Sequence, residues 1–183
     1  TSIDAGDIDI PGFAESAQLR AQEEGDQSLA DEEAFGSLPN SFSESDTGAA
    51  GLSFSGDNGF VGVSVRKLES RYGVVVHHDE EDPAAGGAEE SPFIELEQTR
   101  YDIAGGAYLD GEFFDQFRMA VSGVDYQHIE FEAPGEPGTI FNSEGVEGRA
   151  ELLHEHASGV KGSWGVQASR RDFEALGEEA FIT

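Results

Sequence analysis

Long stretches of this chain alternate apolar and polar side chains with a period of two, and this pattern limits the possible folds most. Val61, Val63 and Val65 alternate with Gly62, Ser64 and Arg66. An alternation of this kind places the apolar side chains on one face of a β-strand. The same pattern predicts strands over 49–56, 60–72, 96–108, 115–130, 145–156 and 161–173. We therefore expect an all-β fold, an antiparallel up-and-down meander in which each strand pairs with its neighbour in sequence.

The connections between these strands alternate between long and short. Long polar loops are expected over about 12–47, 73–95 and 131–143, and short turns near 55–59, 109–112 and 157–159. Tight turns at one end and wide loops at the other are typical of outer-membrane barrels. The 13 residues of 60–72 extend about 43 Å, or roughly 33 Å along the membrane normal when tilted, which is enough to cross the hydrocarbon layer. The pattern thus predicts part of a transmembrane β-barrel.

Two sets of side chains would then face different surroundings. Lipid would contact Val61, Val63, Val65, Phe117, Met119, Val121, Trp164 and Val166, and a polar lumen would contain Arg66, Arg100, Asp102, Arg118, Arg149 and Gln167. Aromatic residues near the predicted strand ends fit interfacial girdles; they are Phe60, Phe113, Phe114 and Trp164 by the short turns, and Tyr72 and Tyr126 by the long loops. The same residues would also suit the core of a soluble acidic β-sandwich, a secreted binding module, and this alternative stays open.

Charge and composition remove several classes of function. The chain has 10 Lys+Arg against 38 Asp+Glu, a formal net charge of -28, which would repel the phosphates of a nucleic acid. It contains no cysteine, so disulfides and thiolate metal sites are excluded. No sequence motif of a hydrolase, zinc protease, P-loop or dinucleotide-binding enzyme occurs, and we expect neither catalysis nor a required cofactor. No signal peptide opens the chain, which starts at Thr1 and is expected to be a fragment.

Several phrases of the sequence resemble one known family, the TonB-dependent receptors of Gram-negative outer membranes. The resemblance lies in the segments 9–13 (DIPGF), 69–73 (ESRYG), 96–102 (LEQTRYD), 125–131 (DYQHIEF), 145–149 (GVEGR) and 171–181 (RDFEALGEEAF). It implies an outer-membrane barrel of about 22 strands, a plug domain of the same full-length chain in its lumen, and a TonB energy-coupling complex as partner. Residues 1–183 would then be a partial barrel domain, without the plug and the C-terminal strands.

The resemblance also implies a function, the active uptake of a scarce ligand. Within the family, the chain looks most like receptors for metal ions, whose loops rich in His and acidic residues collect zinc. The corresponding residues here are His77, His78, Asp79, Glu80, Glu81 and Asp82. Imidazole and carboxylate groups are suitable ligands for zinc, so the cargo could be this ion, another divalent cation or a metal chelate. A solvated loop with incidental histidines, acidic for solubility or for growth in high salt, is the alternative interpretation.

Three further histidines lie outside this loop. His128, close to Asp125 and Glu130 in sequence, is a candidate for cation passage, whereas His154 and His156 are expected to be ordinary interfacial or lumen residues.

Overall fold

The computed structural model describes residues 1–14, 34–75, 91–155 and 159–177, and these residues form β-strands joined by turns. The strands are β1 (Ser2–Ala5), β2 (Ile8–Phe13), β3 (Phe35–Leu38), β4 (Ser43–Gly56), β5 (Gly59–Gly73), β6 (Phe93–Tyr108), β7 (Gln116–Ala133), β8 (Glu136–Glu155) and β9 (Lys161–Gly177). Strands β4 to β9 are 14 to 20 residues long, well above the five or six residues that are usual in globular proteins.

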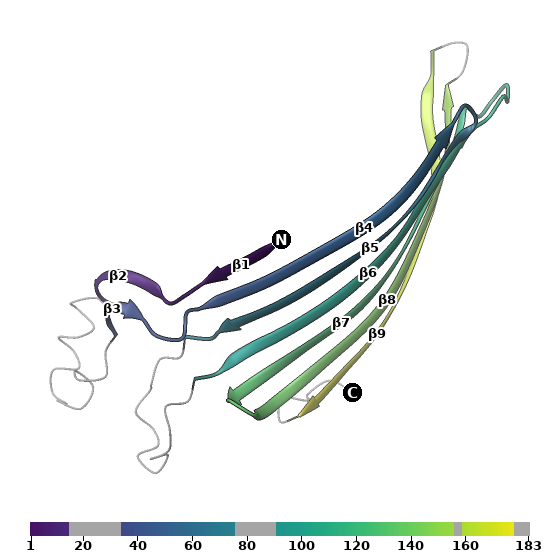
Figure 1. Cartoon of the computed structure of the whole chain (residues 1–183). Helices are drawn as coiled ribbons and strands as arrows, with labels where there is room; N and C mark the ends of the chain where they lie inside the picture. Colours follow the sequence, from purple (N-terminus) through teal and green to yellow (C-terminus); the bar gives the residue numbers. More distant parts are fainter. Residues whose placement is uncertain (15–33, 76–90, 156–158, 178–183) are drawn as a thin grey trace.

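Seven strands form one antiparallel sheet in the order β1-β4-β5-β6-β7-β8-β9, and β2 pairs with β3 in a separate hairpin. The all-β meander predicted from the sequence is therefore confirmed, with every one of the six long strands beside its sequence neighbour (Figure 1). The sheet is curved and open, and within the described residues neither β2–β3 nor any other element packs across its long strands.

The register of the long strands explains why the period of two matters. Pairing from β4 to β5 runs without a shift over its full length, and the same holds from β5 to β6. Residues opposite each other in an antiparallel sheet share a face, so a slip by one residue would move every side chain to the other face. Because the pairing does not slip, the apolar residues of neighbouring strands lie opposite one another on the same face of the sheet.

The prediction of one of the three long loops is wrong. Residues 131–143 are not a long loop, because β7 continues to Ala133 and β8 already begins at Glu136. Pro134 and Gly135 form a tight turn in which Gly135 has a φ of 88°, as a type II turn requires of its third residue. The second proline, Pro137, lies where the register shifts, and a bulge tolerates a residue without an N–H donor. Two prolines close together predict a loop, whereas in the structure one lies in the turn and the other at a bulge.

The other two long connections also contain more structure than expected. Within 12–47, the end of β2, the whole of β3 and the start of β4 are ordered strands, and β6 begins at Phe93, inside the expected loop 73–95. The ends of this second connection are held together, since the Val74 N–H donates to the Pro92 carbonyl at 2.9 Å. The Asn40 amide donates to both the Val74 and Pro92 carbonyls, at 2.8 and 2.6 Å.

Candidate functional site

One face of the sheet carries a continuous apolar band across β4 to β9. The band consists of Leu52, Phe54, Val61, Val63, Val65, Tyr101, Ile103, Phe117, Met119, Val121, Val146, Leu152, Trp164 and Val166, with Gly and Ala between them. All eight residues predicted to face lipid belong to it. Leu52 is 77% exposed, and Trp164 and Val166 are each 68% exposed, so no described element covers the band.

Polar side chains bound the apolar band on both sides. On β8, Glu144 and His154 lie on the same face as the band and ten positions apart, with only Val, Gly, Ala and Leu at the alternate positions between them. Ten residues at ~3.3 Å span about 33 Å along the strand, or roughly 25 Å along the normal at a tilt near 40°. This is the height of the apolar zone of an outer-membrane barrel.

Beyond the band, toward the ends opposite the short turns, the same face becomes acidic. We call this the acidic zone; its carboxylates are Glu44, Asp46, Glu69, Glu95, Glu97, Asp125, Glu144, Asp172 and Glu174, and its bases are Lys67, Arg71 and Arg170. Lys67 Nζ contacts the carboxylates of Glu69 and Glu97 at 2.6 and 2.7 Å, and these hydrogen bonds raise the pKa of Lys67. These ion pairs are exposed and contribute little stability, so the zone is a solvated surface.

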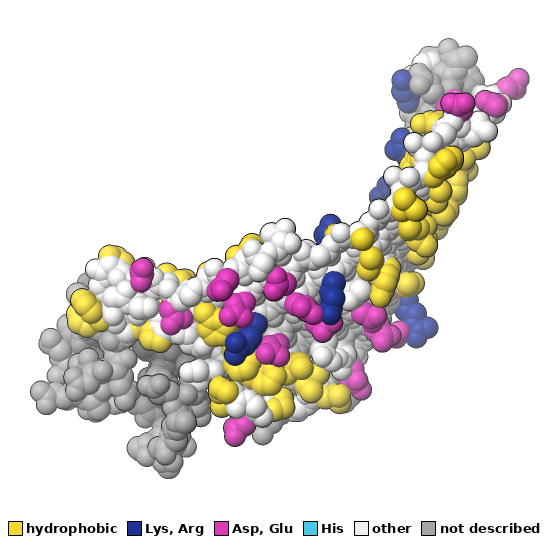
Figure 2. All heavy atoms as spheres, in the orientation of Figure 1, with side chains coloured by type: hydrophobic (Ala, Val, Ile, Leu, Met, Phe, Trp, Pro, Cys, Tyr) yellow, Lys and Arg dark blue, Asp and Glu magenta, His cyan; other side chains and the backbone are white. Residues whose placement is uncertain are grey.

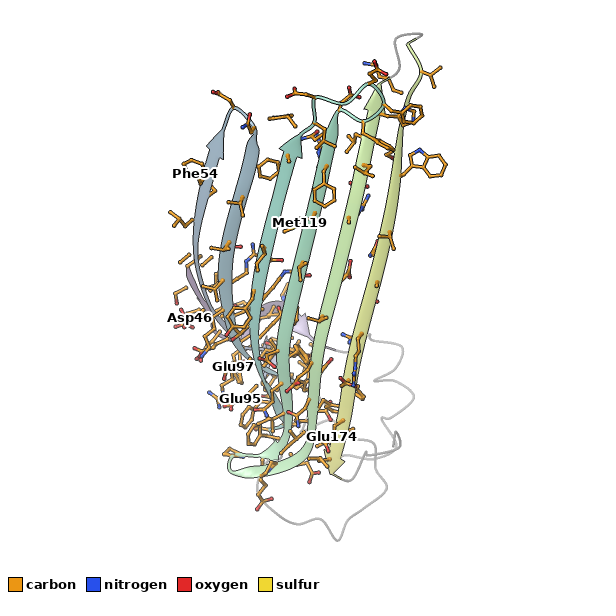
Figure 3. All side chains as sticks on the ribbon, turned by 90° about the vertical axis from the view of Figure 1, so that its right-hand side faces the viewer. Asp46, Phe54, Glu95, Glu97, Met119 and Glu174 are labelled. Atoms are coloured by element: carbon orange, nitrogen blue, oxygen red, sulfur yellow. The ribbon has the colours of Figure 1, made fainter. Side chains whose placement is uncertain are left out.

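The figures show the two zones on the molecule. Figure 2 shows hydrophobic side chains along the narrow part of the sheet, and acidic side chains over the part nearer β2 and β3. Figure 3 places Phe54 and Met119 in the half that ends in the short turns, and Asp46, Glu95, Glu97 and Glu174 in the other half. The face therefore changes from apolar to charged along the strand direction.

The opposite face, which we call the polar face, carries the predicted lumen residues. Arg66, Arg100, Asp102, Arg118, Arg149 and Gln167 all lie on it by register, as their alternation with the apolar residues predicted. Arg100 binds Asp102, with Nη2 2.7 Å from Oδ1, and Arg149 is paired with Glu151. Gln167 donates to Glu147 at 2.6 Å across the strands. Several polar side chains of this face are thus paired with one another along and across the strands.

The aromatic girdle expected from the sequence is only partly present. Trp164 lies in the apolar band, but Phe60, Tyr72 and Tyr126 lie on the polar face, because each is an odd number of residues from a band position on its own strand. A residue near a strand end would lie near a membrane surface. The face on which it lies depends instead on whether its distance in sequence from a band residue is even or odd. Phe54 and Tyr101 are the other large aromatic side chains of the band that are mainly exposed.

His128 is the centre of a half-buried cluster on the polar face, at the end away from the short turns. Its Nδ1 lies 3.2 Å from the Tyr126 hydroxyl, and its Nε2 lies 3.2 Å from Oε1 of Glu130. The imidazole ring packs 4.9 Å from the ring of Phe141. Burial raises the pKa of the Tyr126 hydroxyl, with a smaller contribution from Tyr72.

Only part of this cluster is predicted from the sequence. Asp125, a predicted neighbour of His128, lies on the opposite face, within the acidic zone. Tyr126, predicted to be an interfacial residue, is the second partner of His128. Counting by twos from His128 would have found Tyr126 and Glu130 on one face, so the signal was present in the alternation.

The predicted metal ligands His77, His78, Asp79, Glu80, Glu81 and Asp82 lie outside the described residues. Over the part of the chain that the structure does describe, no three His, Asp or Glu side chains converge as a metal site. The same part of the chain contains no helix that is long and apolar enough to cross a membrane. No known protein-family model matches the sequence.

Proposed function

We propose that this chain forms part of the wall of an outer-membrane β-barrel of the TonB-dependent receptor type, which takes up a scarce ligand. The observation that carries the proposal is the apolar band, which is exposed over six strands and on β8 is bounded by Glu144 and His154, about 25 Å apart along the normal at a tilt near 40°. In this arrangement lipid contacts the band, the acidic zone projects into the outer aqueous phase, and the polar face lines the lumen.

The edges of the sheet support the same arrangement. β1 pairs with only the first four residues of β4, and no described strand lies beside the rest of β4 or beyond β9. Unpaired strand edges are not tolerated in a bilayer, and a barrel removes them by closure. Further strands of the same receptor, a plug domain in the lumen and a TonB energy-coupling complex would complete a transporter.

The soluble acidic β-sandwich is the competing function. It needs a second sheet about 10 Å from the apolar band to cover it. Within the described residues the only other sheet is the hairpin β2–β3, whose strands contact each other and not the long strands. The exposed band therefore favours the barrel.

Trp164 gives a direct test, because it is the only tryptophan of the chain and lies in the apolar band. We expect its fluorescence to shift to the blue in phosphatidylcholine vesicles and to be quenched by bromine atoms on the lipid acyl chains. The control is a chain with Trp164→Phe and Phe173→Trp, since Phe173 lies on the polar face beyond the depth of the band. Equal quenching in both chains, or none in either, would contradict insertion through the band.

The proposed cargo is a metal ion such as zinc, another divalent cation, or a metal chelate. His77 and His78 with the carboxylates of residues 79–82 would capture zinc weakly and release it. We expect zinc binding to fall below about pH 6.5, where imidazole becomes protonated, whereas binding by carboxylates alone would persist to about pH 4. Zinc titration of the chain and of a His77→Ala/His78→Ala variant measures this. The same affinity and pH profile in both would leave the loop as a solvated acidic surface.

A further inference from the structure

At the depth of the apolar band, the polar face carries more positive than negative charge. Its basic residues there are Arg66, Arg100, Arg118, Arg149 and Arg171, and its acidic residues are Asp102, Glu147 and Glu151. The whole chain has 10 Lys+Arg against 38 Asp+Glu, so half of its basic residues lie on this one area. All five are arginines, whose planar guanidinium binds carboxylate and phosphate groups through two parallel hydrogen bonds. The charge of this area therefore favours an anion.

Arg66 and Arg100 lie directly opposite each other on β5 and β6. The β-carbons of such a pair are about 4.5–5.5 Å apart, so two long side chains can reach one ligand between them. Like charges in this position destabilise the strand pairing, and an anion between them would remove the repulsion. Arg66 is exposed and the Arg100 side chain is 43% exposed, so a solute can reach both guanidinium groups.

Only one of these two arginines has a carboxylate partner among the described residues. Nε and Nη2 of Arg100 donate to the carboxylate oxygens of Asp102 at 3.0 and 2.7 Å. No acid of the described part of the chain forms an ion pair with Arg66. Two guanidinium groups and one carboxylate leave one positive charge without a counter-ion. The N–H groups of Arg66, and those of Arg100 that Asp102 does not use, are available to a ligand.

The polar face is hollowed beside Arg66, because the residues opposite on β4 are small. Ala49 lies opposite Arg66, and Gly51 lies opposite Ser64. The hollow has a volume of about 200 Å³, and its lining includes Ala49, Gly51, Ser64, Arg66 and Asp102. This is enough room for a carboxylate or phosphate group together with water. The Ser64 hydroxyl can donate a further hydrogen bond there, and the one acid in the lining, Asp102, is already bound by Arg100.

We propose that Arg66 and Arg100, with the Ser64 hydroxyl, bind a small oxyanion in this hollow, through a carboxylate or phosphate group of the ligand. Binding is weak and reversible, because the hollow is open to solvent and dissolved salt screens the charges. The role of the site in uptake rests on the proposed function. If the polar face lines the lumen, its charge favours an anionic metal chelate over a bare divalent cation as cargo.

The test titrates the full chain in maltoside micelles with citrate and, separately, with inorganic phosphate, at constant ionic strength. We expect saturable binding, and we expect Arg66→Gln to weaken it about tenfold, because the anion loses its charge-assisted hydrogen bonds to this guanidinium. The matched control is Lys67→Gln. Lys67 follows Arg66 in sequence and carries the same charge, but it lies on the other face, bound to Glu69 and Glu97. Its substitution should leave the affinity unchanged.

A further variant, Asp102→Asn, separates anion binding from a structural role of the same side chains. It removes the negative charge from the hollow and releases Arg100, so we expect the anion to bind several-fold more tightly. A purely structural role of the Arg100–Asp102 pair would not raise the affinity, and an unchanged or lower affinity in a folded Asp102→Asn chain would contradict the site. Strand content by circular dichroism shows that each variant is folded.

The two ligands distinguish the two chemistries of the anion. Binding of citrate alone assigns the site to carboxylates, and binding of phosphate alone assigns it to phosphates. The site is overturned if neither ligand binds saturably, or if Arg66→Gln and Lys67→Gln weaken binding equally. Anion binding by a chain that does not insert Trp164 into vesicles would reject the barrel and keep the site, whereas insertion without anion binding would reject the site alone.

Discussion

Arginine in place of Val121 is expected to destabilise the lipid-inserted chain by about 2–4 kcal/mol, whereas arginine in place of the adjacent Ser122 should cost little. Val121 lies in one of the two inner rows of the apolar band, between Ile103 and Gly148 on the neighbouring strands. A guanidinium there would be placed in hydrocarbon. Ser122 points to the polar face, between Asp102 and Glu147, where a positive charge meets two carboxylates.

The two variants each add one positive charge at adjacent positions of the same strand, so the net charge is matched and the main difference is the face on which the guanidinium lies. Urea unfolding in phosphatidylcholine vesicles, followed by the fluorescence of Trp164, gives both free energies of unfolding. If Ser122→Arg lowers the free energy of unfolding as much as Val121→Arg does, the band does not face lipid. If neither substitution lowers the free energy of unfolding, the sheet does not span the bilayer.

The second large effect is on behaviour in water, where we expect the 183-residue chain not to be a folded monomer. Its apolar band and its two sheet edges would remain exposed, and large apolar patches and open edges drive association. The net charge of -28 opposes association, but at physiological salt its repulsion is screened over about 8 Å. The rows of the band contain no acidic side chain and only one basic one, Arg170 opposite Val146 at the edge of the acidic zone, so most of the contact between two bands meets no like charges.

Analytical ultracentrifugation with and without detergent measures this. We expect large, heterogeneous species in plain buffer and a single detergent-bound species above the critical micelle concentration. A compact monomer in plain buffer with one cooperative melting transition would support the soluble β-sandwich and reject the barrel.

The period of two allowed much of the sheet to be predicted. A strand needs no tertiary information to place alternate side chains on opposite faces, so the six long strands and both sets of face residues followed from local sequence. The resemblance to TonB-dependent receptors added a proposed function.

The turn at Pro134 and Gly135 was missed for a local reason. Proline and glycine mark both loops and tight turns, and the composition of 131–143 does not separate the two. The pairing of β7 with β8 decides it, because it continues through a bulge to Ala133 opposite Glu136, directly beside the turn. The long-loop, short-turn alternation therefore fails at β7–β8, even though the strands themselves were predicted.

The sequence by itself determined the six long strands, the face on which each of their side chains lies, and the separation of apolar from charged residues along them, whereas it did not predict β1, β2 and β3. Only the tertiary structure decided which residues of different strands are neighbours. Register depends on the pairing of residues up to about fifty positions apart, such as Gly59 with Ala107, and no local pattern specifies it. That register brings valines of separate strands together in one apolar band, and it places Phe141 of β8 against the imidazole of His128 on β7.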